Sequence, residues 1–173
     1  MEYEIAGLPL HVLLVHAVVV LVPLLALLLV VIAAWPGARR VLWLPALIGA
    51  AILLPLGLVT IEAGEWLKDR VPETPLIEAH TDIGDSIVPW LVALLVVAAA
   101  IAAWAVVELL AARRASDGEA ARPGRGVRIA VAAVLTLAAL IVAVGSTWTV
   151  VLIGEAGSRA VWEGSFSDVP LED

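Results

Sequence analysis

The sequence contains no cysteine, and its 173 residues include only one methionine, one tyrosine and one phenylalanine. Without cysteine the chain can form no disulfide, no thiolate metal site, no cysteine-ligated iron–sulfur cluster and no covalent c-type haem. Since Met1 is the sole methionine, histidine is the strong axial ligand that the chain offers to a haem iron. Charged residues are also scarce, at 16% of the chain.

Long hydrophobic runs are what the chain has in abundance. Hydrophobic residues make up 62% of it, whereas soluble domains contain about 45–50%. Four segments are apolar enough to cross about 30 Å of hydrocarbon as helices, namely residues 8–35, 41–61, 76–112 and 127–153. The third helix is expected to begin early because Thr74 and Pro75 are typical of a helix start. We therefore predict an all-α, integral membrane four-helix bundle that forms a single domain over residues 1–173, with connections at 62–85 and 113–126.

The charges are distributed unequally between the two sides of this bundle. Seven of the ten basic residues flank two connections on the same side, namely Arg39, Arg40, Arg113, Arg114, Arg122, Arg125 and Arg128. The positive-inside rule places that side in the cytoplasm, and so predicts a multi-pass protein with both termini outside. The outer side carries 14 acids against 3 bases, which favours cations and basic partners and argues against nucleic acid.

All three histidines fall on the predicted outer side. His16 lies roughly 8 residues into the first apolar run, on the order of 12 Å along a helix, where an ionisable side chain is expensive and therefore a candidate for function. His11 precedes it by five residues, about 140° around the helix, so the two side chains address different partners. We expect His16 to face the bundle interior and His11 to reach the interface. His80 falls within the first turns of the third helix.

Acidic side chains accompany the histidines. Glu62 and Glu65 are spaced i,i+3, as are Asp82 and Asp85, so each pair can share one helical face. Paired carboxylates in a low-dielectric site suit a cation or a shared proton, and the alternative is solvated charge at a helix end. Imidazole with carboxylate suits a divalent transition metal. The candidate metal ligands are His16, His80, Glu155, Glu62 and Asp82.

The chain contains a possible internal repeat. The second helix ends in IEAG at residues 61–64 and the fourth in GEAG at residues 154–157, and each hairpin begins with histidine at its outer end. Two hairpins of the same topology are related by an axis along the membrane normal. We therefore state a duplicated hairpin as a hypothesis.

Four motifs together resemble one known pattern: GLPLHVLLVH at residues 7–16, AGEWL at 63–67, EAHTDIGD at 78–85 and GEAGSRAVW at 154–162. They are similar to the bacterial membrane family catalogued as domain of unknown function 2231, over roughly residues 7–162. The resemblance implies a four-helix integral protein of the bacterial cytoplasmic membrane. Some relatives carry an appended Rieske-type iron–sulfur domain, which implies redox traffic near the membrane.

The chain departs from the family pattern at two positions. Val12 stands where members commonly have proline, and Glu155 stands where they commonly have histidine. The resemblance therefore implies a set of His11, His16, His80 and Glu155 in place of four histidines. Such a set leaves either one bis-histidine haem or a mixed nitrogen and oxygen metal site.

The leading functional hypothesis is a membrane-embedded redox protein that binds one b-type haem near the outer face. His16 and His80 are the expected axial pair, His11 is a further candidate, and Arg159 or Lys68 would meet the propionates. The alternatives are a divalent-metal site, a non-catalytic scaffold or accessory subunit, and transport. Transport is disfavoured because Glu108 stands nearly alone on the cytoplasmic half.

The residues leave open whether the chain is an enzyme, since no hydrolase or phosphate-loop motif occurs. The expected partners are the lipid bilayer, a redox partner protein at the outer face and, as a further alternative, a second copy of the chain.

Overall fold

The computed structural model describes residues 2–116, 123–167 and 169–170 of the chain. A short hairpin of β1 (Glu4–Ile5) and β2 (Leu8–Pro9) leads into the helices. These are α1 (Leu10–Ala34), α2 (Pro36–Lys68), α3 (Pro75–Gly84), the 3-10 turn η1 (Asp85–Ile87), α4 (Val88–Ser116) and α5 (Arg125–Trp162). The predicted all-α four-helix bundle is confirmed, because four long apolar helices pack together, and all four are candidate membrane spans.

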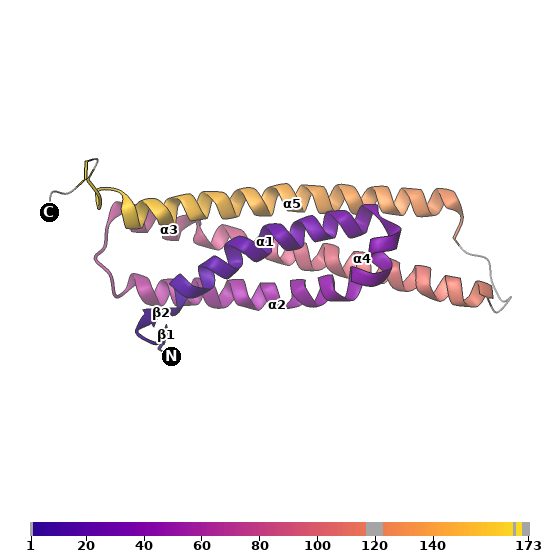
Figure 1. Ribbon diagram of the computed structural model, residues 1–173, viewed down its shortest axis with the longest axis horizontal. Coiled ribbons are helices and arrows are strands. Elements are labelled where there is room, and N and C mark those ends of the chain that lie inside the picture. Colours follow the sequence, from indigo (N-terminus) through magenta and orange to yellow (C-terminus); the bar gives the residue numbers. More distant parts are fainter. Residues whose placement is uncertain (1, 117–122, 168, 171–173) are drawn as a thin grey trace.

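The four long helices form a closed ring of neighbours. Helix α1 packs against α2 and α5, and α4 packs against the same two helices, so α1 and α4 lie diagonally opposite (Figure 1). The N-terminus, the α2–α3 connection and the C-terminal end of α5 lie at one end of the bundle (Figure 1). The start of α1 and helix α3, which contain His11 and His80, lie at the same end. We call this the histidine end. The other end holds the α1–α2 turn, the end of α4 and the start of α5, and we call it the arginine end.

Helix α1 lies within its predicted bounds of 8–35, whereas α2 and α5 extend beyond theirs. Helix α2 begins at Pro36 and continues to Lys68, so residues 69–74 are the non-helical part of the connection predicted over 62–85. Pro36 occupies the first turn of α2, where the missing N–H costs nothing. Helix α5 continues past residue 153 to Trp162. The prediction followed the apolar runs, whereas the polar residues after each run are also compatible with a helix. Of the linker predicted over 113–126, residues 117–122 lie outside the described part.

The third span is interrupted near its start. Helix α3 begins at Pro75, and Thr74 caps it by accepting a hydrogen bond from the N–H of Ile77, which confirms the predicted helix start. The single helix predicted over 76–112 is nevertheless divided by η1. Pro89 has no N–H to donate to the carbonyl of Asp85, and its ring would clash there in a regular helix. The N–H of Val88 bonds to that carbonyl instead, so the chain makes a 3-10 turn.

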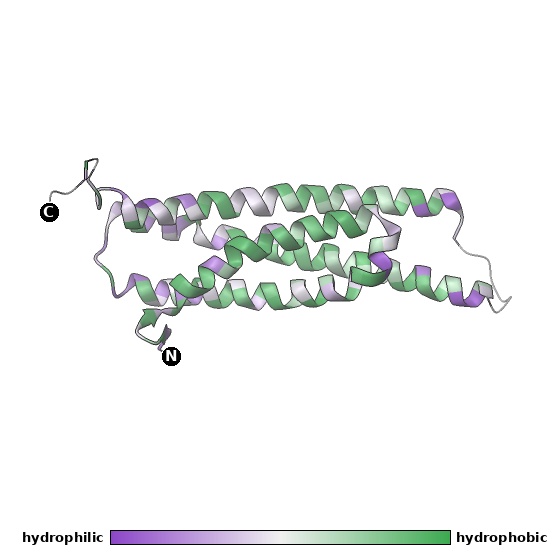
Figure 2. Cartoon of the chain, viewed as in Figure 1, coloured by the Kyte–Doolittle hydropathy of each residue, from purple (hydrophilic) through white to green (hydrophobic). Residues whose placement is uncertain are grey.

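The bundle buries a core and leaves an apolar surface. Core side chains with less than 2% exposure include Val22, Leu29, Ile32, Leu91, Leu94 and Ile101. Large apolar side chains on the outer surface are widely exposed, as Val41 (73%), Val144 (70%) and Leu27 (60%) illustrate. Hydrophobic residues run along the middle of every long helix, and hydrophilic residues gather at the two ends (Figure 2). All four spans are long and apolar enough to cross a membrane, so these side chains are suited to contact lipid.

Candidate functional site

The histidine end brings two imidazoles together. His11 lies in the first turn of α1 and His80 in α3, and their ring centroids are 6.2 Å apart with an interplanar angle of 72°. Both side chains are half-buried. The neighbour of His80 in the structure is thus His11, whereas from the sequence we expected His16 to be paired with His80.

A backbone carbonyl fixes the orientation of each ring. The Nδ1 atom of His11 lies 2.8 Å from the carbonyl oxygen of Thr60 on α2, and that of His80 lies 3.2 Å from the carbonyl oxygen of Ile153 on α5. A carbonyl oxygen only accepts, so each Nδ1 carries the hydrogen and donates. In the neutral imidazole the Nε2 atom is then unprotonated and offers a lone pair. Histidine ligands of metals are oriented by this kind of hydrogen bond.

Each ring also rests on a glycine of the helix that supplies the carbonyl. A Cβ atom placed on Gly64 would lie 2.8 Å from Nδ1 of His11, and one on Gly157 would lie 3.0 Å from Cε1 of His80. A Cβ atom at Gly64 would force the His11 ring to shift, and one at Gly157 would make the His80 ring give by a few tenths of an ångström, so both rings pack closely because a side chain is absent. The glycines are the last residues of the two EAG motifs seen in the sequence.

The two hairpins use the same arrangement. In each, the carbonyl that accepts from histidine lies four residues before the glycine on which that histidine rests. The two carbonyls belong to Thr60 and Ile153, and the two glycines are Gly64 and Gly157. This match of contacts supports the hypothesis of a duplicated hairpin. Alignment of the two EAG motifs in the sequence would have shown that Thr60 and Ile153 occupy equivalent positions, one helical turn before Gly64 and Gly157.

His16 does not face the interior as we expected. Its side chain is exposed, and its Nδ1 atom bonds to the carbonyl of Val12 in the same helix at 2.6 Å. The buried face of α1 contains Val18, Val22 and Leu25, which follow His11 at helical spacing. His16 is about 140° away from that face, so the expectation that it faces the interior was wrong.

The acidic residues of the predicted metal set are exposed at the surface. Exposed carboxylates are Glu62, Glu65, Asp82, Asp85 and Glu155. Among the described residues, no group of three or more histidine or acidic side chains is placed to hold a metal ion. The predicted ligands His16, His80, Glu155, Glu62 and Asp82 are therefore not gathered around one point. The arrangement agrees with solvated charge at helix ends for both carboxylate pairs.

Arg159 has acidic neighbours on its own helix. Its guanidinium lies 2.8 Å from Glu155 and 4.0 Å from Glu163, and all three side chains are more than half exposed. These are i,i+4 pairs on the surface of α5. Lys68, the other predicted partner for propionates, donates to Thr81 at 3.3 Å and so lies beside the residue that follows His80.

The N-terminal hairpin is tied to α2 next to the histidine pair. Ala6 and Gly7 both have positive φ in its two-residue turn, as a type I′ turn requires. Tyr3 donates a hydrogen bond of 2.8 Å to Glu62, and its ring meets Trp66 edge to face at 6.5 Å. The hydrogen bond to Glu62 is the main cause that raises the pKa of Tyr3 above its ordinary value.

The arginine end contains a buried ion pair that sequence reasoning missed. Arg39 is 1% exposed, and its guanidinium contacts Glu108 of α4 at 3.0 and 3.3 Å. It also donates to the carbonyls of Ile32 and Ala33 at the end of α1. Arg128 of α5 lies 3.7 Å from Glu108 as well. Glu108 is thus not isolated, and the signal that could have shown this is the rule that an ionisable residue inside a membrane span has a partner.

No protein-family model, no curated protein and no solved structure matches this chain in the three comparisons. The resemblance to the 2231 family therefore depends on the sequence motifs alone.

Proposed function

We propose that this chain is a multi-pass membrane redox protein whose histidine end binds one b-type haem through His11 and His80. The protein would lie in a bacterial cytoplasmic membrane with both termini and the histidine end outside. The unequal distribution of arginine between the two ends supports this orientation. The acidic outer surface would then favour a basic redox partner.

The observation that carries the proposal is that the two imidazoles are held in the same way, each by a hydrogen bond to a backbone carbonyl and by contact with a glycine. Each donates its Nδ1–H to a backbone carbonyl and packs on a glycine, so in both neutral rings the Nε2 atom is the one that carries the lone pair. His11 and His80 are the two residues that would hold the haem, because histidine is the strong iron ligand that the chain offers and the two rings come from different helices. The centroids of His11 and His80 are 6.2 Å apart.

The number of available ligands favours haem over a bare divalent ion. A zinc site normally takes three or four protein ligands, and the described residues hold no such group. A porphyrin supplies four nitrogens of its own, so two histidines complete the coordination of its iron. When bound in this way, haem supplies one-electron transfer. The chain's own residues would fix the two imidazoles, and Lys68 is the cation best placed to meet a propionate, since the charge of Arg159 is already opposed by two glutamates.

A structural role is the second candidate. Each histidine already joins two helices through one hydrogen bond and one glycine contact, α1 to α2 for His11 and α3 to α5 for His80. A scaffold held by these two contacts needs no cofactor. The two functions differ in what the purified protein absorbs.

The deciding experiment is a visible spectrum of the detergent-purified protein, oxidised and then reduced with dithionite, from cells supplied with a haem precursor. We expect a Soret band and sharp reduced α and β bands. His11→Ala and His80→Ala should each abolish them, whereas the matched control His16→Ala should keep them. A featureless spectrum, or bands lost in His16→Ala and kept in His11→Ala, would overturn the proposal. Elemental analysis of a colourless sample then separates a metal site from a scaffold.

A further inference from the structure

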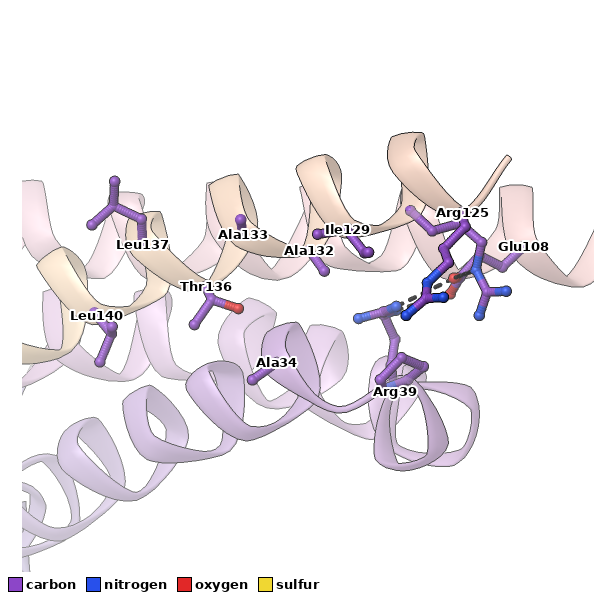
Figure 3. A pocket seen from close by; sticks show the side chains of 12 residues that line it. Ala34, Arg39, Glu108, Arg125, Ile129, Ala132, Ala133, Thr136, Leu137 and Leu140 are labelled. Atoms are coloured by element: carbon purple, nitrogen blue, oxygen red, sulfur yellow. Dashed lines mark hydrogen bonds and ion pairs between the residues drawn. The ribbon is translucent and has the colours of Figure 1, made fainter. Parts of the chain in front are cut away.

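A cleft opens at the arginine end, far from the histidine pair. Its volume is about 860 Å³, and it lies between the first turns of α5, the α1–α2 turn and Glu108 of α4. Figure 3 shows Arg39, Arg125 and Glu108 gathered at one end of it, while the labelled side chains of α5 from Ile129 to Leu140 extend away from them. The cleft is therefore charged at one end, and the rest of its lining is apolar apart from the hydroxyl group of Thr136.

The charged end of the cleft has an excess of positive charge. Three arginines, Arg39, Arg125 and Arg128, face the single carboxylate of Glu108, which gives a net charge of +2. The guanidinium of Arg39 is occupied by Glu108 and two carbonyls, and Arg128 shares the same carboxylate at 3.7 Å. Arg125 is exposed and forms no ion pair within the described part of the chain. The charge that Glu108 leaves uncompensated is thus concentrated at Arg125 and Arg128.

The start of α5 adds to the attraction for an anion. No side chain caps this helix at Gly124, and its first turn contains no acidic residue. The backbone N–H groups of that turn carry the positive end of the helix dipole. They lie beside Arg125 and Arg128, so the helix and the two side chains favour negative charge at the same place.

The apolar part of the cleft has the length of one lipid leaflet. From Ile129 to Leu140 helix α5 rises roughly 16 Å, and half of a hydrocarbon core is about 15 Å thick. The neighbouring side chains are open to the surroundings of the bundle, as Leu137 (60% exposed) and Val134 (67%) show. An occupant can therefore enter from the bilayer.

We propose that this cleft binds an anionic phospholipid, with its phosphate at Arg125 and Arg128 and one acyl chain along α5 past Ala133 and Leu137. The combination of a basic end at interfacial depth and an apolar groove one leaflet long matches an anionic amphiphile. A neutral lipid would leave the excess positive charge uncompensated. A small anion would leave the groove without an occupant.

The test is the thermal stability of the purified protein in neutral detergent with added dioleoyl phosphatidylglycerol. A ligand that binds only the folded state raises the unfolding midpoint, so we expect a rise of several degrees with this lipid and little change with dioleoyl phosphatidylcholine. Arg125→Gln/Arg128→Gln should lose the rise. The matched control Arg113→Gln/Arg114→Gln, which changes two exposed arginines of α4 outside the cleft, should keep it.

Three outcomes would overturn the proposal. Equal stabilisation by both lipids would indicate general solvation of the bundle, and an unchanged response in the Arg125 and Arg128 variant would place the lipid elsewhere. The same rise with inorganic phosphate alone would indicate a small-anion site. Because Arg125 is exposed and without an ion pair among the described residues, Arg125→Gln alone provides a variant that should fold and still weaken the response at least partly.

Discussion

Thr60 on α2 and Ile153 on α5 are equivalent positions, since the carbonyl of each accepts the Nδ1–H of one histidine from the neighbouring helix. Each lies two residues before a glutamate and four before the glycine on which that histidine rests. The two hairpins thereby deliver one imidazole each to a common place at the histidine end. A ligand bound there would be met by two groups with the same tautomer and the same support.

The close packing of His11 on Gly64 and of His80 on Gly157, which we call the glycine seats, predicts that one added methyl group lowers stability. Gly64→Ala would place a Cβ atom 2.8 Å from Nδ1 of His11, and Gly157→Ala one 3.0 Å from Cε1 of His80. Overpacking of this kind costs about 1–3 kcal/mol, and displacement of each ring should weaken its hydrogen bond to the carbonyl. We expect a lower unfolding midpoint and weakened haem bands in both variants.

The matched control for these two variants is Gly154→Ala, because a Cβ atom there meets nothing within 4 Å. It should be neutral or stabilising by up to about 1 kcal/mol, the gain of alanine over glycine within a helix. Equal stability of Gly64→Ala and Gly154→Ala in thermal unfolding would contradict the glycine seat.

Replacement of His16 by leucine should be tolerated. Its imidazole is exposed on a face that also presents Val19 and Val20 and bonds within its own helix to the carbonyl of Val12. Leucine favours the bilayer by about 0.5 kcal/mol, so we expect equal or higher stability in detergent and an unchanged visible spectrum. A large fall in the unfolding midpoint would show that His16 has a partner at this face.

The buried ion pair predicts a strong effect at the arginine end. Arg39→Met leaves Glu108 short of its closest partner and two carbonyls at the end of α1 without a donor. Breaking a buried pair on one side costs about 3–5 kcal/mol, so the unfolding midpoint should fall markedly. Arg39→Met/Glu108→Met should recover part of the loss, since no uncompensated carboxylate remains. Arg40→Met, at the adjacent exposed position, is the control and should change little.

The hydrogen bond from Tyr3 to Glu62 predicts a pH dependence that can be followed directly. The chain has one tyrosine, so phenolate absorbance near 295 nm reports on Tyr3 alone. The pKa of Tyr3 is raised because its neutral form donates to Glu62. The contact therefore stabilises the hairpin at pH values below the ordinary pKa of tyrosine, and this contribution is lost as the pH rises through the raised pKa.

The matched variant for the titration is Glu62→Gln, which removes the carboxylate charge. We expect the midpoint of Tyr3 to fall toward its ordinary value in this variant. Identical midpoints in the two proteins would show that the phenol and the carboxylate do not interact in solution.

The sequence predicted the helix start at Thr74 and Pro75, the four spans and the collection of histidines at one end of the bundle. These features depend on local chemistry or on composition along the chain. A capping hydroxyl followed by proline specifies a helix start by itself, and a run of about 20 apolar residues specifies a span. The glycine seats were visible as a repeated EAG motif, although their contact with histidine was not.

The choice between His11 and His16 depended on the tertiary structure. In a soluble helix a polar face marks the exposed side, but α1 is apolar all round because lipid and protein core accept the same side chains. The sequence therefore set how deep each histidine lies and left undetermined which of them faces the bundle. The partnership of Arg39 with Glu108 has the same origin, since two residues on different helices meet only when the packing of α2 against α4 brings them together.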